Sequence, residues 1–382
     1  MKPLVIIGTG LAGYNVAKEF RKLNTEQELV LISHDDGCSY SKPMLSNALA
    51  KEKTPYSLVI ADANKMSATL SAKIITHTHV TRIDTHAQQL YLDTGETQDY
   101  SQLVLAVGAQ TIATPLSGDG VDGVFYVNNL QDYTTFHSNV SKAKHVAIIG
   151  PGLIGCEFAN DLVSQDKAVT VIGPDSAPLG RLLPDTAGEF LQQHLSSAGV
   201  AWQLQTTVES INKLGDQYQL SLSNGEMLEV DLVLSAIGLK PDISLAEAAG
   251  LIVDHGVVVD TYLRSSVKNI YALGDCAQVA GHVLPFIMPI MHCSRALAKT
   301  LAGDESAVSY PAMPVLVKTP ACATVIAPPA REAQGEWQVE ATTSGVTAKF
   351  LNSQADLLGF ALLGDAVQHK QQLSKVLPDV LV

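Results

Sequence analysis

The sequence has few aromatic residues, few positive charges and no long apolar run. Aromatic side chains make up 5% of the 382 residues, and 25 Lys and Arg stand against 38 Asp and Glu, a formal net charge of −13. A nucleic-acid-binding chain needs a basic surface, so we expect no nucleic-acid partner. No stretch approaches the roughly 18 apolar residues that span a bilayer, and the first residues lack the cleavage site of a signal peptide. We therefore expect a cytoplasmic protein that does not insert into membranes.

The cysteines are an odd number, scattered, without a C-x-x-C pair. They are Cys38, Cys156, Cys276, Cys293 and Cys322. This spacing argues against a disulfide framework and a metal knuckle, so reduced structural thiols are expected. His77 and His79 lie in an alternating segment with no acidic or thiol companion. No metal site is predicted.

A strand, a tight turn, a helix and a second strand occur twice in the chain. The first unit comprises Pro3–Gly8, Leu11–Leu23 and Leu29–Ser33; the second comprises His145–Gly150, Gly152–Val163 and Val169–Gly173. Each has the apolar strands and helical periodicity of a dinucleotide-binding βαβ unit. At roughly 150 residues per domain the length allows two to three domains. We therefore predict an α/β protein with two Rossmann-like domains.

Both units carry the pattern G-x-G-x-x-G between strand and helix. The loops are Gly8-Thr9-Gly10-Leu11-Ala12-Gly13 and Gly150-Pro151-Gly152-Leu153-Ile154-Gly155. The first glycine permits the turn, the second lets a pyrophosphate approach the backbone, and the third lets helix and strand pack closely. One such match can arise by chance, but two at equivalent places are specific. Pro151 occupies a position where no side-chain contact is needed.

The residues after each second strand are expected to bind an adenosine ribose. Ser33, His34 and Asp35 follow the first, and Asp35 is the expected ligand of the hydroxyls, although a solvated turn is the alternative. In the second unit Gly173 stands where an acid is usual, and the carboxylate is displaced to Asp175. No basic pair follows to bind a 2′-phosphate, which favours NADH over NADPH, with Arg181 the one cationic candidate nearby.

The remaining segments alternate apolar and polar residues. Gln217–Leu222 followed by Asn224-Gly225 predicts antiparallel strands joined by a tight turn. From about Ser306 the chain has strands near Val315 and from Trp337 to Phe350, then a helix over 365–376. We predict a separate C-terminal α+β domain.

Three further segments resemble motifs of the pyridine-nucleotide:disulfide oxidoreductase superfamily. Tyr271–Asp275 resembles its second FAD motif, and Leu103–Gly108 and Leu234–Gly238 resemble the segments that return each dinucleotide-binding domain to its sheet. The order along the chain is that of the superfamily. The resemblance implies a glutathione-reductase-like architecture. Its domains would be a discontinuous FAD-binding domain over 1–110 and 240–305, an NAD-binding domain over 111–239 and a small C-terminal domain over 306–382.

The resemblance, together with the loops, assigns residues to each cofactor. Those expected at FAD are Gly8, Thr9, Gly10, Leu11, Ala12, Gly13, Ser33, His34, Asp35, Lys42, Pro43, Val80, Ala106, Gly108, Gly274, Asp275, Ile287 and Lys318. Those expected at NADH are Gly150, Gly152, Leu153, Ile154, Gly155, Glu157, Asp175, Ile237 and Gly238.

The segment Ser39–Ser46 resembles the Y-x-[KR]-P-x-L-S motif of flavin reductases that serve iron-sulfur or iron-thiolate proteins. Thiol-cycling relatives carry a redox cysteine here, whereas this chain has Lys42 and Pro43, so electrons should leave directly from the flavin. With Lys318–Cys322 and the short C-terminal domain, the whole chain is similar to the NADH:rubredoxin reductases of alkane-degrading bacteria. The chain also resembles flavorubredoxin reductases, almost as strongly.

The resemblance implies rubredoxin as partner and a role in alkane hydroxylation. Ferredoxin or flavorubredoxin reduction and NADH oxidase or peroxidase activity are the alternatives, as is a nucleic-acid-binding redox sensor, which the acidic balance disfavours. The short C-terminal domain favours a monomer.

Two charged residues are implied near the reactive ring, Lys42 and Glu157, with Glu157 beside the nicotinamide. Lys318 and Ile287 are implied near the isoalloxazine. Hydride transfer between cofactors needs no acid or nucleophile from the protein. We expect Lys42 to stabilise the reduced ring electrostatically and to pair with Glu157, because a buried charge needs a partner. The alternative is that Lys42 is a surface lysine.

Overall fold

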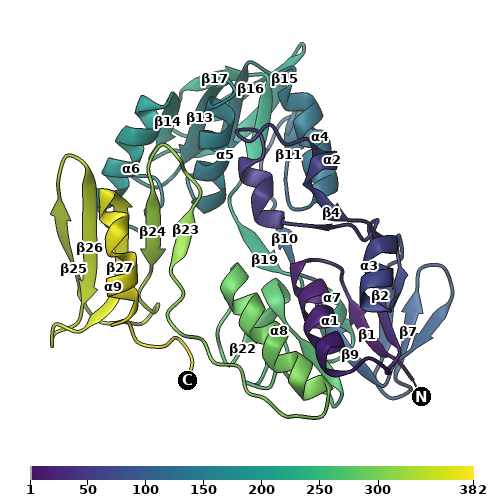
Figure 1. The fold of residues 1–382 in the computed structure, drawn as a ribbon. Coiled ribbons are helices and arrows are strands. Elements are labelled where there is room, and N and C mark those ends of the chain that lie inside the picture. Colours follow the sequence, from purple (N-terminus) through teal and green to yellow (C-terminus); the bar gives the residue numbers. More distant parts are fainter. Residues whose placement is uncertain (1) are drawn as a thin grey trace.

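The computed structural model describes residues 2–382, and within them the chain forms three five-stranded sheets. Figure 1 shows one sheet at the lower right, one at the top and one, from the C-terminal part of the chain, at the left. The expected α/β architecture with a C-terminal α+β domain is confirmed.

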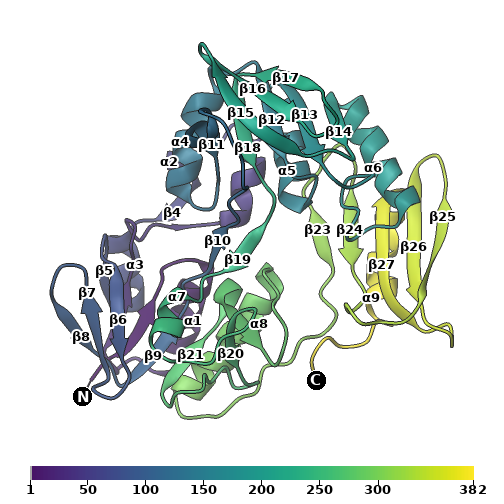
Figure 2. The ribbon, with the colours of Figure 1, turned by 180° about the vertical axis from the view of Figure 1, so that it is seen from behind.

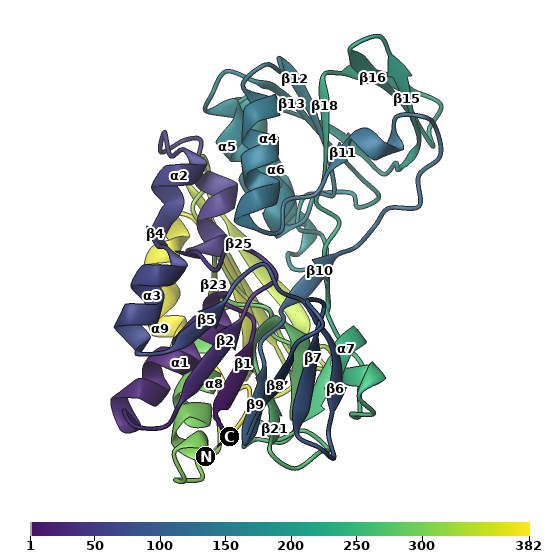
Figure 3. The ribbon, with the colours of Figure 1, turned by 90° about the vertical axis from the view of Figure 1, so that its right-hand side faces the viewer.

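The first sheet is parallel, with strand order β21-β9-β1-β2-β5. Its strands are β1 (Leu4–Ile7), β2 (Leu29–Ile32), β5 (Lys73–Ile75), β9 (Gln102–Leu105) and β21 (Ile270–Ala272). Residues far apart in sequence thus complete one sheet. Helices α1 (Leu11–Leu23) and α8 (Ile287–Leu301) cover one face, and an antiparallel sheet covers the other (Figure 3). That sheet comprises β6 (Val80–Asp84), β7 (Gln89–Leu92) and β8 (Thr97–Asp99).

The predicted strand and helix of the first unit are confirmed, because β1 is fully buried and α1 has the expected bounds. A strand buried on both faces is apolar throughout, which is why the run LVII indicates it. An excursion after β2 contributes β3 (Ser39–Tyr40), the 3₁₀ turn η1 (Lys42–Asn47), α2 (Pro55–Leu58), β4 (Val59–Ala61) and α3 (Ala63–Leu70). The excursion carries η1 to the second domain, where it contacts α5 (Leu153–Val163).

The second sheet repeats this plan with strand order β11-β18-β12-β13-β14, again parallel. Its strands are β11 (Val124–Phe125), β12 (His145–Ile149), β13 (Ala168–Gly173), β14 (Val200–Leu204) and β18 (Leu232–Ser235). Its helices are α4 (Leu130–Val140), α5 and α6 (Asp185–Ser197). The predicted hairpin belongs to the small antiparallel sheet β15 (Val208–Leu214), β16 (Gln217–Leu222) and β17 (Met227–Val230).

Two antiparallel strands connect the first two domains. These are β10 (Ala109–Thr111) and β19 (Leu239–Pro241), which pair between the upper and lower parts of the molecule in Figure 2. The chain leaves the first domain along one and returns along the other. Short elements then complete the first domain: α7 (Ser244–Ala248), β20 (Val257–Val259), η3 (Gly274–Cys276) and β22 (Ala277–Val279).

The C-terminal sheet is antiparallel, with order β23-β24-β27-β26-β25. Its strands are β23 (Val315–Val317), β24 (Thr324–Ala327), β25 (Glu336–Ala341), β26 (Gly345–Leu351) and β27 (Leu357–Gly364). One face shares an apolar core with the second domain, in which Val346 and Leu363 belong to the same cluster as Leu191 of α6. The predicted helix over 365–376 is shorter and divided, into η4 (Asp365–His369) and α9 (Lys370–Ser374). Gly364 precedes it and offers no side-chain cap.

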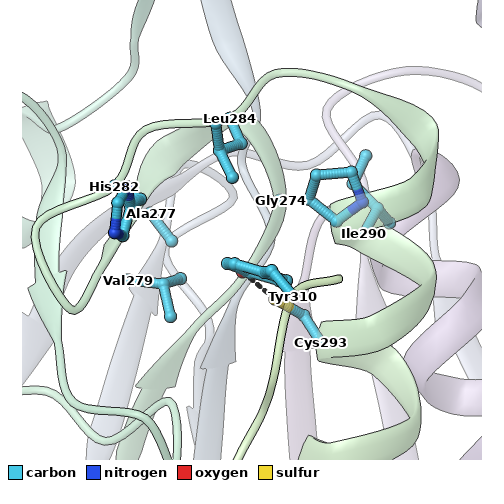
Figure 4. Close-up of a pocket in the computed structure, with 9 residues that line it drawn as sticks. Gly274, Ala277, Val279, His282, Leu284, Ile290, Cys293 and Tyr310 are labelled. Atoms are coloured by element: carbon cyan, nitrogen blue, oxygen red, sulfur yellow. Dashed lines mark hydrogen bonds between the residues drawn. The ribbon is translucent and has the colours of Figure 1, made fainter. Parts of the chain in front are cut away.

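Tyr310 ties the linker before this domain to both neighbours. Its backbone NH donates to Leu381 O at 2.7 Å, and its carbonyl accepts from Val380 N at 2.7 Å. Its buried hydroxyl lies 2.9 Å from Cys293 Sγ of α8 (Figure 4). The cavity beside this contact measures about 10 Å³, which is room for one water at most. It is a packing junction and not a ligand pocket.

Candidate functional site

The first glycine loop makes close backbone contacts on one side and is open on the other. A Cβ on Gly8 would lie 2.2 Å from Ala106 O, and one on Gly13 would lie 1.9 Å from Gly8 O. Only glycine fits at these two positions. A Cβ on Gly10 would meet no protein atom within 4 Å. The loop therefore presents an open surface at the N-terminus of α1, where a phosphate can approach the backbone NH groups.

The second loop has the same geometry. A Cβ on Gly155 would lie 1.9 Å from Gly150 O, one on Gly150 would lie 2.7 Å from Ala236 O, and one on Gly152 would meet nothing within 4 Å. The intervening Leu153 and Ile154 begin α5. The chain thus holds two separate phosphate cradles of one design.

A series of hydrogen-bonded polar side chains lies at the carboxyl end of β2, beside the first loop. Thr9 Oγ1 lies 2.5 Å from Ser33 Oγ, and Ser33 Oγ donates to Asp35 Oδ1, which also accepts from Gly37 N at 2.9 Å. His34 is exposed, with its ring centroid 5.5 Å from that of His79, next to the half-buried Val80. These residues lie together where the ribose and adenine of the first nucleotide are expected, and their roles stay predictions.

The carboxyl end of β13 differs from this arrangement. A Cβ on Gly173 would lie 2.2 Å from Pro151 Cδ, so the proline ring packs directly on the glycine. The prediction that Pro151 has no side-chain contact to make is wrong. An acid at 173 would clash with this ring. Asp175 is half-buried two residues later, at the place that Asp35 has in the first unit.

The return segments complete both cradles. Gly108 has φ +77° and Gly238 has φ +130°, and the Cβ position of Gly108 is open. Ile237, beside Gly238, is 37% exposed. Gly274 has φ +79°, and its Cβ position lies 2.7 Å from Ala12 Cβ, which brings the motif that contains Asp275 against the first loop. Gly274 and Asp275 therefore lie beside the first loop, where a dinucleotide bound at the N-terminus of α1 would extend.

Lys42 and Asp275 are the main charges of the first site. Burial lowers the pKa of Lys42, an effect that Asp275 and then Asp132 oppose. Burial raises the pKa of Asp275, and Lys42 opposes that shift. Lys42 Nζ donates to Asn128 Oδ1 at 2.7 Å, and Asn128 Nδ2 donates to Ala109 O at 2.8 Å. A desolvated cation and anion beside open glycines fit a ligand that has both a diphosphate and hydroxyl groups.

The expected pairing of Lys42 with Glu157 is wrong, because the partner of Glu157 is Lys318. Lys318 Nζ forms an ion pair with Glu157 Oε2, and Lys318 N donates to Oε1 at 3.0 Å. Ser46 Oγ donates to Oε2 at 2.6 Å and accepts from Lys318 Nζ at 2.8 Å. The Glu157 side chain is 8% exposed. Three domains therefore meet at the Glu157 carboxylate. Lys42 does not belong to this junction, because its hydrogen-bond partner is Asn128 and the anion that acts on it most is Asp275.

The next turn of α5 extends this junction. Asn160 Oδ1 accepts from Ala321 N at 3.0 Å, and Asp161 accepts from Leu49 N and Ala50 N at 3.0 and 2.8 Å. Burial raises the pKa of Asp161, and the two backbone NH groups oppose the shift. Sequence reasoning missed Ser46, Asn128, Asn160 and Asp161. The segment EFAND of α5 offered a signal, because its acids and amides fall on a helix too apolar to be a surface helix.

A groove of about 310 Å³ opens beside the junction. Asn47, Asp161 and Lys318 line it, as does Leu316, whose side chain is 59% exposed. Ile287, at the start of α8, is 44% exposed. Pro43 is half-buried within η1. Leu316 is thus an accessible apolar side chain in the groove beside the ion pair of Glu157 and Lys318.

Neither a disulfide nor a cluster of metal ligands is present within residues 2–382. All five cysteines are free, and those other than Cys38 are buried. Burial raises the pKa of Cys38 to about 11 and that of Cys276 to about 12. Across residues 2–382 no group of three or more His, Cys, Asp or Glu side chains is arranged to hold a metal ion.

Comparison with known proteins decides the family. The model of the pyridine nucleotide-disulphide oxidoreductase family matches residues 2–299. The chain belongs to this family. The model of a rubredoxin binding C-terminal domain matches residues 307–377. The family membership confirms FAD and a nicotinamide dinucleotide as the cofactors of this oxidoreductase.

Curated relatives match over the full length. The chain is 48% identical to a rubredoxin-NAD(+) reductase of Alcanivorax borkumensis, over 100% of both chains. It is 46% identical to one of Acinetobacter baylyi, over 100% of this chain and 99% of the relative. A solved putidaredoxin reductase in covalent complex with putidaredoxin has 26% identity and a TM-score of 0.88, covering 99% of this chain and 94% of that one.

Proposed function

We propose that this oxidoreductase transfers electrons from NADH through FAD to rubredoxin. The observation that carries the proposal is the match of residues 307–377 to a rubredoxin binding domain, in a chain 48% identical to a rubredoxin-NAD(+) reductase. That domain supplies Lys318, which reaches Glu157 in the second domain. The partner-binding domain and the hydride-transfer site would thus share a side-chain contact.

The proposed division assigns FAD to residues 1–110 and 240–305, NADH to 111–239 and the partner to 306–382. The loop from Gly8 to Gly13 and the Asp275 motif would hold FAD, with Lys42 near its reactive ring. The loop from Gly150 to Gly155 would hold NADH. When bound, the two cofactors supply the hydride and electron chemistry. The residues of the chain bind them, orient them and exclude water.

Glu157 and Lys318 have an orienting role in this proposal. The ion pair keeps an ammonium group beside the flavin and a carboxylate beside the nicotinamide without leaving either charge unpaired. Ser46 Oγ donates to the same carboxylate oxygen as the Lys318 ammonium group, and Lys318 N donates to the other. Lys42 would stabilise the reduced ring electrostatically, and Asp275 is the anion that opposes the effect of burial on its pKa most strongly.

Electrons would leave the flavin directly, because no reactive thiol lies at the site and Pro43 stands where thiol-cycling relatives have cysteine. The net charge of −13 makes a local apolar or basic contact, rather than overall attraction, the docking force for an acidic partner. Leu316 and Ile287 are apolar candidates for that contact. The protein would act as a cytoplasmic monomer that supplies electrons for alkane hydroxylation. No helix within residues 2–382 is long and apolar enough to cross a bilayer.

The test is anaerobic reduction by NADH followed by titration with purified rubredoxin, flavorubredoxin and ferredoxin. Oxidation of the reduced flavin should be fastest with rubredoxin. If flavorubredoxin or ferredoxin oxidises the reduced flavin faster than rubredoxin does, that carrier and not rubredoxin is the partner. NADH consumption in air at the same rate with and without any carrier would favour an oxidase.

A further inference from the structure

The contact between Pro151 and Gly173 closes the usual place of the ribose-binding acid. An acid at the end of the second strand in a Rossmann unit binds the adenosine ribose. Here a Cβ at 173 would lie 2.2 Å from Cδ and 2.5 Å from Cγ of Pro151. No side chain fits at 173 while the ring stays in place. The first domain has Thr9 and Ser33 at the equivalent places, where two hydroxyl groups form a hydrogen bond instead.

Backbone hydrogen bonds prevent the proline from moving aside. Pro151 O accepts from Leu179 N at 2.9 Å and from Cys156 Sγ at 3.4 Å. Pro151 is buried, and Cys156 belongs to α5. The loop, the helix and the segment that follows β13 are therefore fixed to one carbonyl group.

Backbone hydrogen bonds also fix the segment from Gly173 to Asp175. Its carbonyl accepts from Gln205 N at 3.1 Å, and Gly173 O accepts from Thr206 N at 3.2 Å. A Cβ on Gly180 would lie 3.3 Å from Asp175 Cβ, so a glycine leaves room for the aspartate. Arg181 follows and is exposed. One carboxylate and one cation thus lie within the loop beside the adenosine end.

We propose that Pro151 and Gly173 are a coupled pair that determines coenzyme specificity. The proline ring excludes an acid at 173 and leaves recognition of the 2′-hydroxyl to Asp175 alone. Discrimination against a 2′-phosphate then depends on Asp175, which would repel it, and on Arg181, an exposed cation of the same loop. The inference rests on the proposed function only in placing NADH on the second loop. It adds that the preference for NADH can be raised by changing two residues together.

The experiment is a double-mutant cycle of Pro151→Ala, Gly173→Glu and the combined variant. Anaerobic flavin reduction by NADH and by NADPH is followed for each, without any protein acceptor. We expect Gly173→Glu alone to slow reduction by NADH at least about tenfold, because its Cβ meets the ring. The combined variant should recover reduction by NADH and have an NADH to NADPH ratio at least about tenfold above that of the original chain, since an added acid repels the 2′-phosphate. Asp175→Asn should lower the ratio.

Ala201→Glu is the matched control, since it adds the same carboxylate at an exposed position of the neighbouring strand β14 and should leave the ratio unchanged. Flavin content and circular dichroism report folding. If Gly173→Glu does not fold, Gly173→Ala with and without Pro151→Ala takes its place in the cycle. The proposal is overturned if Gly173→Glu alone keeps the NADH rate, or if the two substitutions act independently. Failure of both nucleotides to reduce the flavin of the original chain would instead contradict the proposed function.

Discussion

Lys318 and Glu157 are 161 positions apart in the sequence, and their side chains form an ion pair at the junction of three domains. The lysine comes from the loop after β23 and the glutamate from α5. Ser46 of η1 bonds both side chains. The domain that matches a rubredoxin binding model is thereby joined to the second glycine-loop unit through one ion pair.

Lys318→Met should destabilise the protein by about 2–3 kcal/mol, below the 3–5 kcal/mol of fully buried pairs because Lys318 is 24% exposed. It should also slow flavin reduction, since Glu157 loses the cation that orients it. Lys318→Arg should restore part of both losses. Urea unfolding and stopped-flow reduction are the measurements. Lys375→Met, an exposed lysine of the same domain, is the control, and equal behaviour of the two Met variants would contradict the role.

Gly10→Ala and Gly152→Ala should separate the two cofactor sites. Neither Cβ meets a protein atom within 4 Å, so both variants should fold normally. Each methyl group would intrude on a bound pyrophosphate. Gly10→Ala should lose FAD, whereas Gly152→Ala should keep FAD and bind NADH at least about tenfold more weakly. Flavin absorbance and NADH titration distinguish the outcomes; the reverse pattern would exchange the two assignments.

Lys42 should make the stability of the FAD-free protein depend on alkaline pH. Its pKa is below the ordinary value of 10.5, chiefly through burial. Between the folded and unfolded pKa values the unfolded chain binds more protons, so the free energy of unfolding should rise with pH in that window. Lys42→Met should abolish the rise and weaken FAD binding, whereas the exposed Lys18→Met should do neither. An unchanged pH profile in Lys42→Met would place the lysine in solvent.

Turnover should resist thiol reagents. Four of the five cysteines are buried, and burial raises the pKa of Cys38 to about 11, so little thiolate is present at neutral pH. Iodoacetamide at pH 7.5 should leave activity intact, and mass spectrometry should find Cys38 as the first residue labelled. Inactivation in step with labelling of any cysteine would revive a thiol relay. Cys38→Ser should behave as the unmodified protein does.

Tyr310→Phe should cost about 1 kcal/mol of unfolding free energy, the usual value of one hydrogen bond, because its buried hydroxyl contacts Cys293 Sγ. Thermal unfolding measures the change. Tyr56, which is 89% exposed, provides the matched Tyr→Phe control and should show none. Equal effects at both positions would mean that the contact contributes nothing to stability.

The fold could be predicted from the sequence because the patterns that indicate its strands and loops are local. Buried parallel strands are apolar throughout, and glycines at Gly8 and Gly13 are required by backbone approaches that no other residue permits. The partner of Glu157 could not be predicted from such signals, because Lys42 and Lys318 are both lysines and only tertiary packing selects between them. Pro151 and Gly173 could have been linked, since a ring and a missing side chain at adjacent strand ends complement each other. Asn128 gave no signal, because its role depends on the position of another domain.

The lysine on the loop after β23 limits how relatives of this protein could be recombined. Grafting a foreign C-terminal domain onto residues 2–305 would exchange the partner surface and would also remove the cation that neutralises Glu157. A chimaera would inherit a buried, unpaired carboxylate unless its donor carried a basic residue at the same place. The C-terminal domain and the charge balance of α5 are therefore inherited together in this chain.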